Sequence, residues 1–316
     1  MDNETTSPPI TIITVTYNSS SYVRDAIESV LAQSYSNIEY IIGDDFSTDN
    51  TWSIIQEYKD SRIKAYRNVS NLGEYPNRNK ALSMASGKYV LFIDGDDMIY
   101  PNAIAFIEKM VTSFPNAGMV IMRPPHPKLF YPLELSSREV LQAEYFDLSL
   151  IDIGLTNTVF RVESLKQVGA FPLNWISSDT FVRFKIALNN STLIINDNLT
   201  WWRHTPGQAT LRHGKSVKGL AQSYRFRRII IDEASQFSEE EKSAAIKNLQ
   251  RGVWVVAMIL VGRGNFVKAF RFVKETRGFS FFLILLSRRK KVDPFANYSS
   301  ARPYRLAWNK NPYSRI

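Results

Sequence analysis

Residues 92–97, FIDGDD, place three carboxylates within four positions, directly after an apolar run. The side chains are Asp94, Asp96 and Asp97, and no Lys or Arg lies within five residues of them. Like charges this close repel one another unless a cation stabilises the ionised forms. Carboxylates without a nearby cysteine suit Mg²⁺ or Mn²⁺, which typically bind through one or two carboxylates plus substrate phosphates. The cluster predicts a metal-bound di- or triphosphate; a solvated acidic cluster or a helix cap is the alternative.

Further candidate contacts lie in GDDFSTDNT, residues 43–51, and in TYNSSSY, residues 16–22. Asp45 could accept hydrogen bonds from a base or a ribose. Tyr17 could stack on a base, or it could be a half-buried loop aromatic. Asp49 and Thr51 are expected to cap a helix.

The elements that must position these side chains alternate between strand and helix. Residues 10–15 form a short apolar, β-branched run that predicts a strand, and further strands are predicted over residues 38–43, 63–66 and 89–93, with helical segments between them. Such alternation implies right-handed crossovers and a mainly parallel sheet, whose ligand lies at the carboxyl ends of the strands. The polar residues after three of these strands should therefore converge: Thr16, Tyr17, Asn18, Asp44, Asp45, Asp94, Asp96 and Asp97.

The chain is expected to divide into a short leader over residues 1–9, an α/β region over 10–215 and a basic, mostly helical region over 216–316. Four prolines between positions 124 and 132 suggest an irregular insertion over 124–150, with a strand over 155–161. The leader lacks the basic and apolar segments of a secretory signal. The absence of cysteine fits a reducing compartment.

The net charge of +9 is distributed unevenly along the chain. Residues 1–200 carry 16 Lys and Arg against 23 Asp and Glu, whereas residues 201–316 carry 23 against 7. A basic second half suggests phosphates, whether of lipid headgroups, nucleic acid or a small substrate.

Three ordered blocks carry a family resemblance: residues 10–35, ITIITVTYNSSSYVRDAIESVLAQSY; 41–51, IIGDDFSTDNT; and 77–97, NRNKALSMASGKYVLFIDGDD. Over roughly residues 10–115 they resemble the family-2 glycosyltransferases of bacterial cell-surface polysaccharide synthesis, which are inverting enzymes with the GT-A fold. The resemblance implies a nucleotide-sugar half over 10–115 and an acceptor half over 116–215.

The resemblance also implies roles for individual residues. Donor contacts would come from Thr16, Tyr17, Asn18, Asp45 and Arg78. Asp94 would contact the ribose or the metal and Asp96 the metal, while Asp97 would support them or contact the sugar.

The second half matches the family through two segments. In residues 168–188, VGAFPLNWISSDTFVRFKIAL, Asp179 stands where the family has its catalytic base, although Ser178 replaces the usual Glu. The alternative for Asp179 is an N-cap of a helix over 180–188. In WWRHTPGQAT, residues 201–210, Arg203 could meet the diphosphate and His204 could be a metal ligand or a structural histidine.

The function implied is metal-dependent transfer of a sugar from a nucleotide-diphosphate sugar to a lipid-linked glycan, and a UDP-sugar is the favoured donor. Transfer of a single sugar is expected, because the signature of processive synthases is missing. Transfer to polyprenyl phosphate is an alternative, and a nucleotidyltransferase or a nucleotide-binding protein is a more remote one. Nucleic acid is not expected as a partner. The phenylalanine-rich blocks contain no charged residues, so they suit burial or contact with lipid better than binding of a nucleic-acid strand.

Two apolar blocks, residues 253–261 and 279–286, are too short to cross a bilayer. Either they are core helices, or the second block, with Arg288, Arg289, Lys290 and Lys291, lies on an anionic membrane surface. The second interpretation predicts a cytoplasmic protein that is peripheral on the inner face of the membrane.

Overall fold

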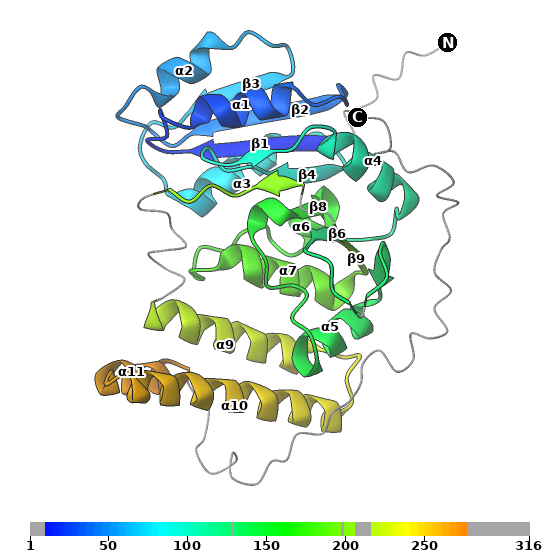
Figure 1. The fold of residues 1–316 in the computed structure, drawn as a ribbon, viewed down its shortest axis with the longest axis vertical. Helices are drawn as coiled ribbons and strands as arrows, with labels where there is room; N and C mark the ends of the chain where they lie inside the picture. Colours follow the sequence, from blue (N-terminus) through cyan, green and yellow to red (C-terminus); the bar gives the residue numbers. More distant parts are fainter. Residues whose placement is uncertain (1–9, 128, 197–198, 206–215, 277–316) are drawn as a thin grey trace.

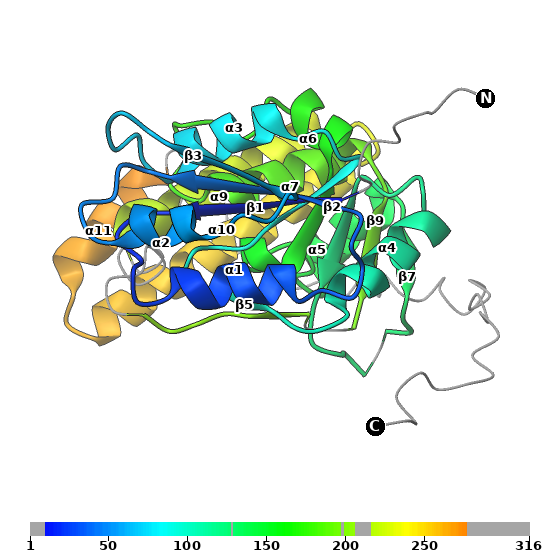
Figure 2. The ribbon, with the colours of Figure 1, turned by 90° about the horizontal axis from the view of Figure 1, so that it is seen from above.

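The computed structural model describes residues 10–127, 129–196, 199–205 and 216–276, and its centre is an eight-stranded sheet (Figure 1). The strand order is β3-β2-β1-β4-β8-β6-β9-β7. Helices cover both faces of this sheet, which confirms the α/β class (Figure 2).

The first half forms the predicted alternation of strand and helix. Its elements are β1 (Ile10–Thr16), α1 (Val23–Leu31), β2 (Ile38–Asp44), α2 (Thr51–Glu57), β3 (Ile63–Arg67), α3 (Glu74–Met84) and β4 (Tyr89–Phe92). Strands β3, β2, β1 and β4 are parallel, and Ile10 pairs with both Ile38 and Tyr89. Every residue of β1 and β2 is buried, because the sheet is covered on both faces.

The second half contains β5 (Met98–Ile99), α4 (Ala103–Ser113), β6 (Met119–Met122), β7 (Leu133–Leu135), α5 (Ser137–Phe146), the 3-10 turn η1 (Leu155–Asn157), β8 (Thr158–Arg161), α6 (Val162–Gln167), α7 (Ser178–Asn189), β9 (Thr192–Ile195) and β10 (Thr200–Trp201). Strand β8 runs antiparallel to β4 and β6, and β7 runs antiparallel to β9, so the sheet is only mostly parallel.

The prediction of an irregular insertion over 124–150 is wrong for much of its length. This segment forms the edge strand β7 and the ten-residue helix α5. A capping box starts α5, since the Ser136 hydroxyl accepts from the Glu139 N–H while the Glu139 carboxylate accepts from the Ser136 N–H.

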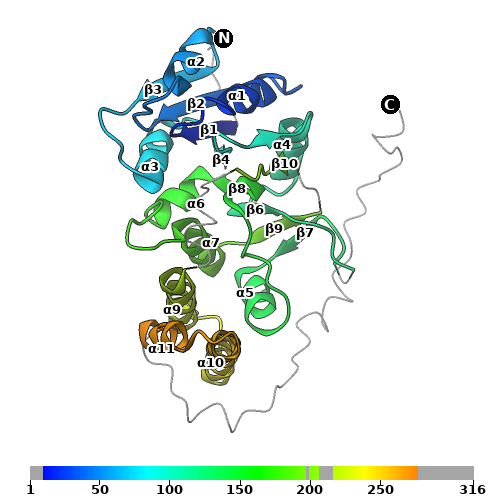
Figure 3. The same cartoon turned by 60° about the vertical axis from the view of Figure 1, so that its left-hand side comes forward.

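The described part of the basic region is helical, as predicted: α9 (Val217–Glu233), α10 (Glu239–Gly262) and α11 (Phe266–Glu275). Figures 1 and 3 show these helices as a layer beneath α7. Phe226 and Ile231 of α9 join the same apolar core as Phe184 of α7. The boundary near residue 215 stays a prediction, and residues 279–291 lie outside the described residues.

Candidate active site

The acidic loop after β4 lies against the end of β1. Gly95 donates its N–H to the Val15 carbonyl at 3.2 Å. A Cβ on Gly95 would lie 2.4 Å from Thr16 Oγ1, so glycine is the residue that fits here. This close approach brings Asp94 and Asp96 to the carboxyl edge of the sheet.

Arg78 of α3 supplies the cation that the sequence around the acidic cluster lacks. Its Nη2 lies 2.7 Å from Asp94 Oδ1 and 3.0 Å from Glu74 Oε1. Burial alone would lower the pKa of Arg78, but Asp94 and Glu74 outweigh it and raise that pKa. Burial also raises the pKa of Asp94, against the opposing effect of Arg78. Asp94 therefore has a cationic partner within the protein, and its additional contact with a metal stays a prediction.

Arg78 also keeps capacity for a ligand. The side chain is 2% exposed, and its Nε and Nη1 are buried without a hydrogen bond to a described residue. A buried guanidinium with two nitrogens left over suits an anionic group such as a diphosphate.

The other two acids bind the segment after β10, which pairs with β5. The Thr205 hydroxyl donates to Asp96 Oδ2 at 2.6 Å, and the Arg203 N–H donates to Asp97 Oδ1 at 3.0 Å. Asp97 is 1% exposed, and burial, followed by the neighbouring Asp94, raises its pKa to about 8. Asp96 and Asp94 are partly exposed, so these two carboxylates are the more accessible ones.

Arg203 lies at the site, but its guanidinium points to α1. Its Nη2 forms an ion pair of 2.7 Å with Asp25, and its Nε donates to the Asp96 carbonyl at 3.0 Å. The guanidinium also lies over the rings of Tyr22 and Trp201. These contacts hold the acidic loop against α1, and the contact of Arg203 with a diphosphate stays a prediction.

The donor set fits a hard divalent cation that a diphosphate completes. Asp94 and Asp96 offer two carboxylates, and Mg²⁺ usually binds through one or two carboxylates beside substrate phosphates. Within the described ranges, no group of three or more His, Asp or Glu is placed to hold a metal by itself. His204 is exposed, and its ring meets Trp202 with centroids 4.3 Å apart. Its role as a third ligand stays a prediction.

The turn after β1 presents an accessible aromatic side chain. Tyr17 is 48% exposed at the edge where β1 ends. Asn18 adopts a positive φ of 50°, and its Oδ1 accepts from the Thr48 N–H at 2.8 Å. Thr16 is buried, with its hydroxyl against Gly95. Of these three predicted contacts, Tyr17 and Asn18 are exposed, and Tyr17 is the one with a ring that could stack on a base.

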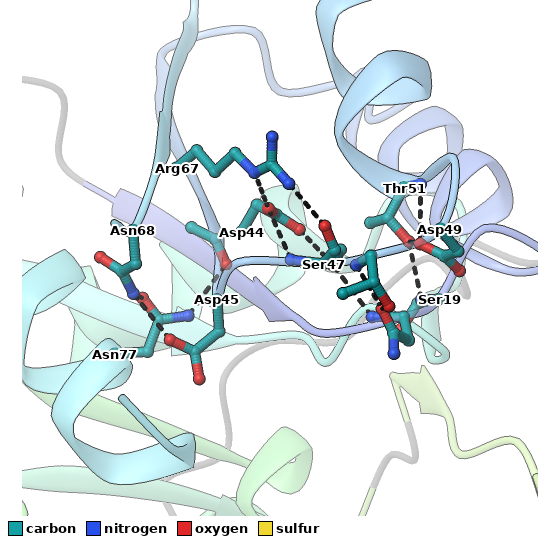
Figure 4. Close-up of polar contacts among 12 residues, drawn as sticks. Ser19, Asp44, Asp45, Ser47, Asp49, Thr51, Arg67, Asn68 and Asn77 are labelled. Carbon is teal, nitrogen blue, oxygen red and sulfur yellow. Dashed lines mark hydrogen bonds and ion pairs between the residues drawn. The ribbon is translucent and has the colours of Figure 1, made fainter. Parts of the chain in front are cut away.

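Asp45 acts as an anchor for the start of α3. Its Oδ1 accepts from Asn68 Nδ2 at 2.8 Å and from the Leu72 N–H at 2.9 Å, and its Oδ2 accepts from the Gly73 N–H at 2.8 Å. Figure 4 shows Asp44 pointing instead toward Ser47 and Arg67. The predicted contact of Asp45 with a nucleotide would add to these bonds.

Asp179 lies in the first turn of α7 and does not cap it. The helix begins at Ser178 after Ser177, so the alternative of an N-cap for a helix over 180–188 is wrong. Asp179 Oδ1 accepts from the Tyr75 hydroxyl at 3.0 Å, and its Oδ2 lies 3.0 Å from Arg183 Nη2. Two partners thus fix the carboxylate.

Tyr75 and Glu74 are site residues that the sequence did not predict. The Tyr75 hydroxyl also accepts from the Ser178 N–H at 3.0 Å, and its ring stacks on Phe171. Burial, followed by the charge of Asp179, raises the pKa of Tyr75 well above its ordinary value. Glu74 could have been found from its position four residues before Arg78, because residues 74 and 78 share a helix face.

The arrangement joins a carboxylate pair suited to a metal diphosphate with a separate, fixed carboxylate. One helical turn of α3 contacts both, since Arg78 binds Asp94 and Tyr75 binds Asp179. A carboxylate so placed can accept a proton from a hydroxyl that attacks beside the diphosphate.

Comparison with known proteins identifies the family of the chain. The family described as Glycosyl transferase family 2 matches residues 11–169, half of the chain. A segment of 88 residues is 47% identical to the Escherichia coli protein UDP-Glc:alpha-D-GlcNAc-diphosphoundecaprenol beta-1,3-glucosyltransferase WfaP, and one of 92 residues is 46% identical to the Bacillus subtilis putative teichuronic acid biosynthesis glycosyltransferase TuaG. Each match covers 28% of this chain and 35% or 36% of the relative, so the chain matches about a third of the relatives' length.

Solved structures share the fold over more of the chain. The S. aureus TarS 1-349 complex with UDP-GlcNAc has a TM-score of 0.64 at 19% identity, over 84% of this chain and 81% of that one. The mannosyltransferase PcManGT from Pyrobaculum calidifontis, in complex with GDP-Man and Mn2+, has a TM-score of 0.58 at 18% identity, over 86% and 88%. Together with the family match and the sheet topology, these likenesses show that the chain has the GT-A fold and belongs to glycosyl transferase family 2, a family of glycosyltransferases.

Proposed function

We propose that this protein transfers one sugar, with inversion, from a nucleotide-diphosphate sugar to a hydroxyl of a lipid-linked glycan, with Asp179 as the base. The observation that carries the proposal is the first turn of α3. That turn holds Asp94 through Arg78 and Asp179 through Tyr75. A donor-side carboxylate and a candidate base are therefore fixed relative to each other by one rigid element.

The donor proposed is a UDP-sugar. Two E. coli relatives are named for UDP-Glc, and two TarS structures hold UDP or UDP-GlcNAc. In this chain Tyr17 would stack on the base, and Arg78 would use its buried Nε and Nη1 on the diphosphate. A Mg²⁺ or Mn²⁺ ion held by Asp96 with Asp94 would offset the charge of the leaving diphosphate.

Asp179 would take the proton from the acceptor hydroxyl as attack begins. The Tyr75 hydroxyl and Arg183 contact its two oxygens, and these contacts support a fixed orientation of the proposed base. An in-line attack with a separate base needs no covalent intermediate with the protein, and one displacement inverts the anomeric centre.

The acceptor proposed is a sugar on a lipid diphosphate. The two E. coli relatives are named for transfer to alpha-D-GlcNAc-diphosphoundecaprenol, which favours a glycan hydroxyl over polyprenyl phosphate itself. A membrane-borne acceptor agrees with the predicted location at the cytoplasmic face of the cell membrane and with the basic region after residue 200.

The test of the base is Asp179→Asn, which keeps the shape of the side chain and removes the proton acceptor. We expect transfer to a GlcNAc-diphospholipid to fall by at least about a thousandfold, within the range that acid–base catalysis and correct orientation supply. Binding of a UDP-sugar with Mn²⁺, measured by calorimetry, should stay near the unsubstituted value.

The matched control is Asp60→Asn, which removes a carboxylate paired with Arg62 before the amino end of β3 and should keep full transfer. Transfer by Asp179→Asn at tens of per cent would contradict the base assignment. If polyprenyl phosphate were the better acceptor, the acceptor assignment would be wrong. If EDTA left UDP-sugar binding unchanged, the proposed role of a divalent metal in donor binding would be wrong.

A further inference from the structure

Helix α11 presents large apolar side chains to solvent. Phe266, Val267 and Phe270 are 65%, 76% and 73% exposed, whereas Ala269 and Phe272 are buried against the neighbouring helices. A short amphipathic helix usually turns its large apolar residues inward. Here both faces carry them, so the outer face is suited to a partner.

The last turns of α10 continue this pattern. Val255, Met258 and Ile259 are 58%, 62% and 48% exposed and share one helix face, while Val253 and Ala257 are buried on the other. Helices α10 and α11 pack directly on each other and on α9 (Figure 3). We call the six exposed side chains the α10–α11 surface: Val255, Met258, Ile259, Phe266, Val267 and Phe270.

Cations accompany this surface. Arg263, Lys268, Arg271 and Lys274 are exposed, and Glu275 is the single acidic residue in positions 251–276. None of these four cations forms an ion pair within the part of the chain that the structure describes. A surface pocket of about 430 Å³ lies among them, lined by Gly264, Asn265, Phe266, Val267, Lys268 and Arg271. The lining combines two apolar side chains with two cations, which suits the apolar and anionic parts of a lipid.

We propose that the α10–α11 surface docks on an anionic lipid bilayer, with its apolar side chains in the interface and its cations on the headgroups. The charge pattern selects this occupant over a second copy of the chain. A two-fold dimer through the same surface would bring Lys268 and Arg271 against their own copies, and like charges disfavour that contact. An anionic leaflet complements them.

Docking differs from crossing the membrane. Among the described residues, α10 is the one helix long and apolar enough to span a bilayer by length and composition. Of its most apolar 18-residue stretch 28% is buried, but Ala245 and Leu249 belong to the main apolar core and Arg263 follows the last turn. The surface therefore lies along the interface, as an amphipathic element does.

The position of the surface agrees with the proposed acceptor, and to that extent the inference rests on the proposed function. Figures 1 and 2 both place α11 on the side of the molecule where β1 and β2 end. Docking through α11 would turn the edge that carries Asp94 toward the membrane region. A hydroxyl on a lipid-linked glycan would then reach the site without leaving its leaflet.

The experiment is flotation of the full chain with vesicles of phosphatidylglycerol and phosphatidylcholine, and with vesicles of phosphatidylcholine alone. We expect binding to the anionic vesicles at about 0.1 M salt and its loss at about 1 M, because the Debye length falls from about 10 to about 3 Å. The triple variant Lys268→Gln, Arg271→Gln, Lys274→Gln should bind about a hundredfold more weakly, at about fivefold per cation. The double variant Phe266→Ser, Phe270→Ser should lose at least about tenfold.

Matched controls are Phe130→Ser, an exposed phenylalanine elsewhere, and Lys166→Gln on α6, and both should bind normally. A further arm replaces Arg288, Arg289, Lys290 and Lys291 with Gln. The proposal would be overturned if the α11 variants bound anionic vesicles normally while the variant at residues 288–291 lost binding. That result would assign the lipid contact to residues 288–291. Three other results would overturn it: no binding to anionic vesicles, resistance to high salt and carbonate, or a dimer that the phenylalanine variants abolish. Calorimetric UDP-sugar binding is read separately, so failure of the docking leaves the proposed function untouched.

Discussion

Tyr75→Phe removes one oxygen atom from the contact between α3 and α7. The phenyl ring keeps its stack on Phe171, with ring centroids 5.8 Å apart. The lost hydroxyl accepts from the Ser178 N–H and has one proton to donate, either to Asp179 Oδ1 at 3.0 Å or to the Ile176 carbonyl at 3.1 Å. A buried N–H left without an acceptor costs about 1–3 kcal/mol, and we expect the free energy of unfolding to fall by that amount.

The effect on the rate follows from what remains around the base. Asp179 keeps Arg183 on Oδ2 but loses the group that orients Oδ1. A displacement of about 1 Å can cost about a hundredfold in rate. We therefore expect kcat to fall by about 10–100-fold in Tyr75→Phe, with the KM for the UDP-sugar almost unchanged.

A double-mutant cycle separates positioning from general weakening. In an Asp179→Asn background, Tyr75→Phe should lower kcat no further, because the two groups act as one unit. Tyr145→Phe is the matched control, since its buried hydroxyl donates to the Arg227 carbonyl at 2.8 Å, away from Asp179. It should lower stability and keep kcat. The reasoning is refuted if Tyr75→Phe loses stability yet keeps kcat, or if the two losses of rate add independently.

Two further substitutions test other parts of the structure. Gly95→Ala would place a Cβ 2.4 Å from Thr16 Oγ1, so it should displace the loop that carries Asp94 and Asp96. We expect a loss of about 1–3 kcal/mol of stability and weaker UDP-sugar binding in calorimetry. Unchanged binding would contradict the close packing of Gly95 on Thr16. Glu39→Gln should lower the free energy of urea unfolding by about 1.5–3 kcal/mol without changing kcat, because buried Glu39 accepts from Thr11, Lys64 and Ser86 at the opposite edge of the sheet. Burial raises the pKa of Glu39, but these hydrogen bonds outweigh burial, so the pKa of Glu39 in the folded protein is lowered. The stabilisation is therefore complete above the ordinary pKa of glutamate and is lost as the pH falls through the lowered pKa of the folded protein. Wild type and variant should then converge in acid, and a constant difference down to low pH would contradict this origin.

The fold of the first half was predictable because its signals are local. Mostly apolar runs of four to seven residues specify β1, β2 and β4, and strand ends specify where Asp45 and Asp94 lie. The direction of β8 was not predictable, because a four-residue strand carries no sign of whether its neighbours run parallel to it. The helix α5 was predictable from Ser136 and Glu139, three residues apart, but the nearby prolines suggested an irregular segment.

The site was predictable as a set of residue types and less so as a set of contacts. Asp94 and Arg78 are 16 positions apart, so the ion pair between them cannot be inferred from the acidic cluster alone. The contact of Arg203 with Asp25 spans 178 positions and depends on the pairing of two short strands, β5 and β10. Long-range contacts of this kind decide whether a predicted arginine faces a ligand or holds a loop.

Helix α3 explains why the donor and acceptor sides can be held to one geometry. Asp45 fixes where the helix begins, through the N–H groups of Leu72 and Gly73. Within the helix Arg78 reaches Asp94, while Tyr75, three positions earlier and about 60° around the helix, reaches Asp179. A shift of α3 would therefore move the donor-side carboxylate and the candidate base together and would keep their separation. The position of Asp45 within this chain of contacts means that its substitution should weaken catalysis even if no nucleotide touches it.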